Sequence, residues 1–151
     1  MRSLTPFLWF DNDLEEAVER YTSLFPDGKV HGMVRSPDGR VLTVDFEIAG
    51  QYVRGLNGGP EFPHTEAFSF FVECDDQEEV DHYWTTLTAG GGRESQCGWL
   101  KDRFGVSWQV IPTEFLEIMS KGTPEQSQRA FAAMQTMQKL DVAALREAAA
   151  G

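Results

Sequence analysis

A weak internal repeat constrains the fold of this chain more than any other feature. With a shift of 63 positions, Glu15-Glu16 falls on Glu78-Glu79, and Pro6 falls on Ser69 in the segment before. Each copy passes from an apolar strand pattern through acidic capping residues to apolar residues at helical spacing. The sequence therefore predicts two passes through one supersecondary unit. The other matched pairs are Tyr21 with Trp84, Thr22 with Thr85, and Leu24 with Leu87.

The first pass predicts a strand, a helix and three further strands. Leu4 to Phe10 is an apolar and aromatic run, so we expect a strand that is buried on both faces. Asp11-Asn12-Asp13 offers capping side chains for a helix from about Asp13 to Leu24. Turn residues then separate three more strands. These are expected at 29–35, at 41–48 with Leu42, Val44, Phe46 and Ile48 on one face, and at 51–57.

The second pass begins after Gly58-Gly59-Pro60-Glu61-Phe62-Pro63, which neither a helix nor a sheet ladder accommodates well. It predicts a strand at 67–74, a helix at 78–87, and strands at 93–96, 98–102 and 106–111. Helices are then expected at 114–120, 124–140 and 142–150.

These elements predict an α+β fold in one domain spanning 1–151. Two βαβββ modules form a curved mixed sheet around a small-molecule pocket, and a helical tail follows. The expected parts are module 1 at about 1–58, a linker at about 59–64, module 2 at about 65–112 and the tail at 113–151.

Charge and cysteine usage narrow the classes of function. The 151 residues carry a formal net charge of −11, which opposes binding to a nucleic-acid backbone. Acidic residues interrupt the apolar N-terminal stretch before it reaches the length of a signal peptide or membrane span. Cys74 and Cys97 fit two thiols in a reducing compartment. We therefore expect a cytoplasmic protein with neither a nucleic-acid nor a membrane partner.

Several segments together resemble one family. They are TPFLWF before the first helix, Leu56-Asn57-Gly58-Gly59-Pro60, the closing GWLKDRFGVSWQVIP and the tail MQKLDVAALREAA. This combination resembles the PhnB-like branch of the vicinal oxygen chelate superfamily, which includes glyoxalases, bleomycin-resistance proteins and extradiol dioxygenases. Members of the branch are often labelled 3-demethylubiquinone-9 3-methyltransferase-like. The chain has no strand-to-helix Gly-rich loop for a nucleotide-derived cofactor, so we do not expect methyl transfer.

The resemblance also implies where a metal would bind. In metal-dependent relatives, His, Glu and similar ligands project from the first and last strand of each module. The matching positions here are Pro6, Asn57, Ser69 and Gln109, which supply no strong donor. We therefore expect no tight metal and no cofactor. The alternative is a metal-dependent lyase, isomerase or dioxygenase in which His64, Glu66 or Glu73 replaces the usual ligands.

Polar and aromatic strand residues are the candidates for a ligand pocket. Amide and hydroxyl groups can orient an organic molecule without the desolvation cost of a charge. The same groups could instead satisfy backbone atoms at strand ends. Cys97 could also act as a nucleophile beside Lys101 or Arg103, although no general base is fixed near it. The candidates are Asn57, Ser69, Gln109, Trp9, Phe71 and Cys97.

Three functions remain open at this point, and whether the chain is an enzyme stays undecided. The first is metal-free binding of a small, partly aromatic organic molecule. The second is the metal-dependent enzyme with unusual ligands. The third is a structural or interaction role, suggested by the acidic surface and the helical tail. The resemblance further implies a symmetric homodimer.

Overall fold

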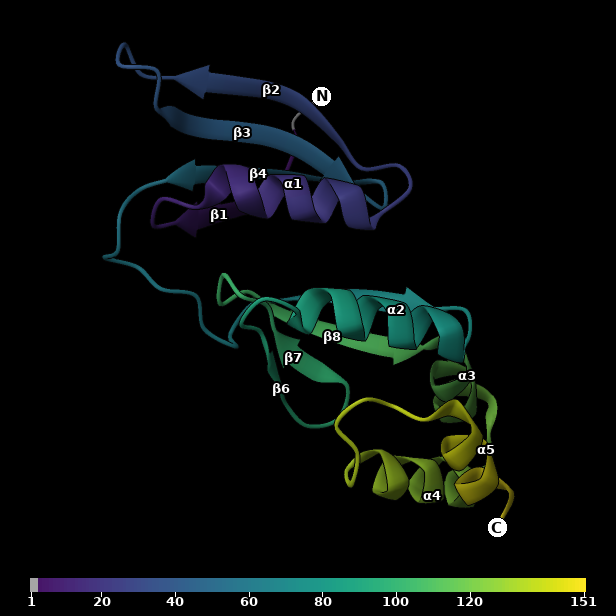
Figure 1. Ribbon diagram of the computed structural model, residues 1–151. Helices are drawn as coiled ribbons and strands as arrows, with labels where there is room; N and C mark the ends of the chain where they lie inside the picture. Colours follow the sequence, from purple (N-terminus) through teal and green to yellow (C-terminus); the bar gives the residue numbers. More distant parts are fainter. Residues whose placement is uncertain (1–2) are drawn as a thin grey trace. The chain divides into compact units, whose positions relative to one another are not determined.

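The computed structural model describes residues 3–151, and the chain divides into two compact units at the peptide joining His64 and Thr65. Each unit contains one four-stranded mixed sheet with a helix on one face (Figure 1). The first unit comprises β1 (Phe7–Phe10), α1 (Leu14–Leu24), β2 (Lys29–Arg35), β3 (Val41–Ile48) and β4 (Gln51–Asn57). The second comprises β5 (Ser69–Cys74), α2 (Gln77–Thr88), β6 (Arg93–Glu94), β7 (Trp99–Lys101), β8 (Ser107–Pro112), α3 (Thr113–Lys121), α4 (Pro124–Met134) and α5 (Val142–Ala150).

Sheet 1, the sheet of the first unit, has the strand order β1-β4-β3-β2. β1 runs parallel to β4, and the other neighbours are antiparallel. The helix α1 is amphipathic and buries Tyr21 completely, together with Leu14 and Ala17. Along β3 and β4 the buried residues alternate, since successive strand side chains point to opposite faces. One face of sheet 1 is therefore covered by α1, and the opposite face carries the polar and aromatic residues.

Sheet 2, the sheet of the second unit, repeats this plan with the order β5-β8-β7-β6. Asp76 caps α2 by accepting a hydrogen bond from the backbone N–H of Glu79, as the acidic pair before this helix predicted. Trp84 and Leu87 of α2 are buried over the sheet. Hydrogen bonds join strands within each module of residues 3–151, so the predicted mixed sheet consists of two four-stranded sheets.

The turn between β7 and β8 is organised by the buried carboxylate of Asp102. Its Oδ1 accepts hydrogen bonds from the backbone N–H groups of Phe104 and Val106, at 2.9 and 3.0 Å. Its Oδ2 accepts one from Nε1 of Trp108, at 3.0 Å. A buried carboxylate is stable only when its oxygens are hydrogen-bonded in this way. The geometry of this tight turn therefore rests on one side chain of the DRFG segment.

The C-terminal helices form their own apolar core with the end of sheet 2. Ile111 of β8 packs in a buried cluster with Phe115, Leu140 and Leu145. The backbone N–H groups of Cys97 and Gly98 donate to the carbonyls of Met137 and Gln138. Nε2 of Gln77 donates to the carbonyl of Leu140, and Oε1 of Gln77 accepts from the N–H of Val142. The tail is thus bound to unit 2 by apolar packing and by main-chain hydrogen bonds.

None of the helices in the described part of the chain is long and apolar enough to cross a membrane.

Three predicted details are corrected. The first strand begins at Phe7 and is not buried on both faces, because Phe7 is 54% exposed. In β3, Val34 pairs with Thr43 whereas Arg35 pairs with Val41, so Leu42 lies in a β-bulge and is exposed while Val41 is buried. The helix predicted at 124–140 ends at Met134, since the following residues form turns whose carbonyls bind Cys97 and Gly98.

Candidate functional site

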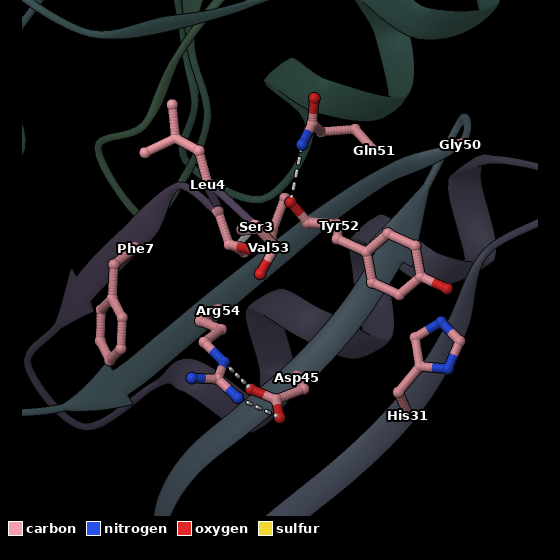
Figure 2. A pocket seen from close by; sticks show the side chains of 11 residues that line it. Ser3, Leu4, Phe7, His31, Asp45, Gly50, Gln51, Tyr52, Val53 and Arg54 are labelled. Carbon is pink, nitrogen blue, oxygen red and sulfur yellow. Dashed lines mark hydrogen bonds and ion pairs between the residues drawn. The ribbon is translucent and has the colours of Figure 1, made fainter. Parts of the chain in front are cut away.

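The uncovered face of sheet 1 contains a pocket of about 800 Å³. Figure 2 shows Phe7, Arg54, Asp45, Tyr52 and His31 along this face of the sheet. The register explains the arrangement, because Phe7 pairs with Arg54 and Arg54 with Asp45, which places their side chains side by side. The full lining is Ser3, Leu4, Thr5, Phe7, His31, Asp45, Gly50, Gln51, Tyr52, Val53 and Arg54.

Polar side chains in and beside this pocket are arranged as pairs. Nε of Arg54 lies 2.8 Å from Oδ1 of Asp45. Nε2 of His31 lies 2.8 Å from Oε2 of Glu47, and the ring of His31 stacks on that of Tyr52 with centroids 4.9 Å apart. Aromatic rings beside compensated charges form a lining that suits the ring and the polar substituents of an organic molecule.

The uncovered face of sheet 2 brings three predicted pocket residues together. Nε2 of Gln109 donates a hydrogen bond to Oγ of Ser69, at 3.0 Å. Phe71 pairs directly with Gln109, which pairs in turn with Trp99, so these side chains form a row across three strands. Phe71 remains 47% exposed. This face therefore offers an amide and two aromatic rings next to one another.

Asn57 does not belong to either uncovered face. Its Oδ1 accepts a hydrogen bond from the backbone N–H of Leu14, and its Nδ2 donates to the carbonyl of Val41. Asn57 is buried, and its partner in the register is the buried Phe10. The side chain of Asn57 thus caps the start of α1, where Asp13 makes no capping hydrogen bond. The predicted pocket residue is corrected to a residue that satisfies backbone groups at a strand end.

The strand register corrects two expected counterparts in the repeat. The buried residues Leu8 and Phe10 match Val72 and Cys74, which lie 64 positions later, whereas the helices match at 63. Pro6 is therefore not the counterpart of Ser69. Since Phe7 pairs with Arg54 and Phe71 with Gln109, the counterpart of Gln109 in sheet 1 is Arg54.

Trp9 lies on the uncovered face of sheet 1, two residues after Phe7 and paired with Leu56, but it does not line the pocket, and Cys97 lies outside both rows. Nε1 of Trp9 donates to the carbonyl of Gly59, and its ring is T-shaped to that of Phe62 with centroids 5.0 Å apart, so Trp9 holds the segment after β4 against β1. Cys97 is half-buried, has a φ of 61°, and packs against the C-terminal cluster. Lys101 instead pairs with Glu66, and the Arg103 guanidinium lies over the ring of Phe104.

Cys74 is fully buried on the covered face of sheet 2. Burial and the nearby carboxylates, Glu79 first among them, raise the pKa of this thiol to about 12. A thiol with so high a pKa is protonated at neutral pH, so Cys74 acts as a small apolar core residue.

The described residues do not fit a divalent metal site. Between Ser3 and Gly151, no three His, Cys, Asp or Glu side chains gather closely enough to hold a metal ion. Arg54 of sheet 1 and Gln109 of sheet 2 occupy equivalent positions on the two uncovered faces. One is a cation and the other a neutral amide, so neither is a strong metal ligand. The proposed substitute ligands have other surroundings, since the ring of His64 lies 5.2 Å from that of Phe10 and Glu66 binds Lys101. Glu73 is exposed on β5.

The sequence interpretation missed several residues of these faces: His31, Asp45, Tyr52, Arg54, Arg93 and Ser107. Alternation along β4 and β8 assigns each residue to one of two faces, but only the cross-strand register shows which residues of different strands are neighbours. The shift of 63 positions pairs Phe7 with Phe70, so the sequence did not reveal that Phe7 and Phe71 are equivalent.

Comparison with known proteins shows the relationship of residues 2–111. The family model described as 3-demethylubiquinone-9 3-methyltransferase matches residues 2–111. Among solved structures, a PhnB protein from Bacillus cereus is similar with a TM-score of 0.68 and 29% identity, over 74% of this chain and 99% of that one. No curated protein matches the sequence.

Two more distant structures share the fold. A protein from Pseudomonas aeruginosa has a TM-score of 0.61 and 18% identity, with 74% of this chain and 98% of that one covered. The fosfomycin resistance protein FosX from Listeria monocytogenes has a TM-score of 0.54 and 16% identity, over 74% and 93% of the two chains. The predicted α+β fold with two βαβββ modules and a helical tail is confirmed.

Proposed function

Because the chain belongs to the 3-demethylubiquinone-9 3-methyltransferase family, the PhnB-like branch of the vicinal oxygen chelate superfamily, we propose that it binds a small organic molecule without a tightly held metal ion. The predicted family resemblance is confirmed by these matches. The family description alone does not support methyl transfer here, since the chain lacks a Gly-rich strand-to-helix loop.

The pocket on sheet 1 carries this proposal. Its volume of about 800 Å³ lies within the range of typical small-molecule sites, roughly 300–1,000 Å³. Phe7 and Tyr52, each 54% exposed, offer ring surfaces that a ligand would remove from water. The Arg54–Asp45 pair between them provides both donors and acceptors. These features support a partly aromatic ligand with polar substituents.

Substitution of Phe7 tests the proposal. A panel of aromatic amides, phenols and carboxylates is screened against the wild type by thermal shift, and the affinity of each hit is measured by calorimetry. We expect Phe7→Ala to weaken a hit by about tenfold, because the apolar area that the ligand buries becomes smaller. Phe131→Ala is the matched control, since Phe131 has comparable exposure but lies on α4, outside this pocket. Equal effects of the two substitutions, or no hit at all, would contradict the proposal.

We also propose a homodimer and a reducing, cytoplasmic location. Val30, Met33 and Val34 on the edge strand β2 are 47%, 42% and 56% exposed, and an apolar sheet edge of this kind favours pairing with a second chain. Both cysteines are thiols, which agrees with a reducing compartment.

A further inference from the structure

A continuous polar row crosses all four strands of sheet 2 on its uncovered face. Ser69 pairs with Ser107, Ser107 with Lys101, and Lys101 with Arg93. Directly paired residues project from the same face with their Cβ atoms about 5 Å apart. Two hydroxyls and two cations therefore lie in one line, next to the row of Phe71, Gln109 and Trp99.

Ser107 is the unusual member of this row. Its side chain is 1% exposed, and its Oγ has no hydrogen-bond partner within residues 3–151. A buried hydroxyl without a partner is uncommon in folded proteins and calls for an explanation. Ser107 lines a pocket of about 200 Å³ together with Trp99, Lys101 and Arg93. The hydroxyl is thus placed to donate a hydrogen bond to a group that enters this pocket.

The charges around the pocket favour an anion. Arg93 is exposed and forms no ion pair within the described part of the chain. Nζ of Lys101 lies 2.6 Å from Oε1 of Glu66, whose side chain is 64% exposed. Glu94, the other carboxylate of the lining, accepts a hydrogen bond from Nε1 of Trp84, at 2.6 Å. An ion pair this exposed contributes little, so another anion can replace Glu66 beside Lys101.

We propose that this pocket binds the carboxylate or phosphate group of a small organic anion. Ser107 donates a hydrogen bond to an anionic oxygen, Lys101 and Arg93 provide the positive charge, and the carboxylate of Glu66 occupies the place of the ligand group until the ligand displaces it. The adjacent rings of Phe71 and Trp99 contact the organic part. This inference does not rest on the pocket of sheet 1.

Three substitutions in the full chain test the site, with benzoate, phenyl phosphate and inorganic phosphate as probes in calorimetric titrations. We expect Lys101→Gln and Ser107→Ala each to weaken the binding of the preferred probe about tenfold or more, as for a lost hydrogen bond to a charged group. Glu66→Gln is expected to strengthen the same binding about two- to fivefold, because the competing carboxylate is removed. Lys121→Gln is the matched control, since Lys121 also pairs with a glutamate, Glu117, but lies on α3.

The stability of the variants separates a binding role from a structural one. Ser107→Ala removes a hydroxyl that the fold does not satisfy, so its melting temperature without ligand should equal or exceed that of the wild type. A lower melting temperature would assign Ser107 a structural role and overturn the inference. The inference would also be overturned if Glu66→Gln bound the probe more weakly than the wild type, or if Lys101→Gln bound it as tightly as the wild type. If every probe is lost in Phe7→Ala but kept in Lys101→Gln, the ligand binds sheet 1, and only the first proposal survives.

The three probes distinguish the sources of the anionic group. Preference for benzoate indicates a carboxylate ligand, and preference for phenyl phosphate a phosphate ester. Equal affinity for inorganic and phenyl phosphate would show that Phe71 and Trp99 take no part, and would overturn the assignment of the organic moiety. Affinity should fall as salt concentration rises, since exposed charges are screened.

Discussion

Asn57 and Ser107 are both buried polar residues on strands, and they differ in whether their side chains form hydrogen bonds. The amide of Asn57 makes two hydrogen bonds to the backbone, to Leu14 and Val41. The hydroxyl of Ser107 makes none within the described residues. Because a buried polar group costs free energy unless it is paired, the first residue stabilises the fold and the second is available for binding.

Replacement of Asn57 should therefore affect stability. Asn57→Ala leaves the N–H of Leu14 and the carbonyl of Val41 buried without partners, at roughly 1–3 kcal/mol for each group. We expect the free energy of unfolding, measured by urea denaturation, to fall by about 2–4 kcal/mol. Asn12→Ala is the control, since Asn12 is exposed just before the same helix. A loss below about 0.5 kcal/mol for Asn57→Ala would show that water replaces the amide.

At the scale of elements, the tail contributes an ion pair between two helices. Nε and an Nη of Arg146 on α5 lie 2.5 and 2.6 Å from the two carboxylate oxygens of Glu114 on α3. This fork geometry is the strongest arrangement of an arginine and a carboxylate. The hydrogen bond from Arg146 lowers the pKa of Glu114 below its ordinary value near 4.5. The ion pair therefore stabilises the tail only where Glu114 is ionised.

The sign of this effect gives a pH-dependent prediction. A carboxylate whose pKa is lowered by folding contributes stability above its ordinary pKa and loses it as the pH falls through the lowered value. We expect Glu114→Gln to lower the free energy of unfolding at pH 7, and the difference from wild type to shrink as the pH falls below 4.5. Thermal denaturation from pH 7 to pH 3 measures this trend. Glu117→Gln serves as the control, because its 3.4 Å contact with Lys121 lies within one helix. A difference that stays constant with pH would refute the role of the ion pair.

Elements were predictable from the sequence where local signals define them. The strands at 29–35, 41–48 and 51–57 have the predicted bounds, because turn residues such as Gly39 and Gly50, with φ of 87° and 76°, mark their ends. The bulge at Leu42 was not predictable, since a bulge depends on the pairing partner. The same holds for Asn57, whose side chain reaches a helix 43 positions earlier in the sequence. The row of Ser107, Lys101 and Arg93 likewise follows from register, which one sequence does not encode locally.

At the scale of the whole molecule, the edge strand β2 determines the expected association. We expect light scattering to give twice the 17.0 kDa mass of the chain for the wild type. Val34→Lys should give the monomer mass, because a lysine on an edge strand opposes sheet pairing. Phe131→Lys on α4 is the control, and it should leave the dimer intact. A monomeric wild type would contradict the proposed dimer, and a monomer with Phe131→Lys alone would place the contact on the tail.

The way in which the tail is attached restricts the residues allowed at the start of β7. The family match ends at residue 111, one residue before the end of β8, and the three helices follow directly. Their attachment uses the backbone N–H groups of Cys97 and Gly98, which have φ of 61° and 83°, and a Cβ at position 98 would lie only 2.9 Å from Cδ1 of Ile111. A side chain at position 98 would therefore strain the backbone and press on Ile111 and Leu140, which belong to the apolar cluster that holds the tail. The attachment of the tail to unit 2 thus depends on a glycine at position 98.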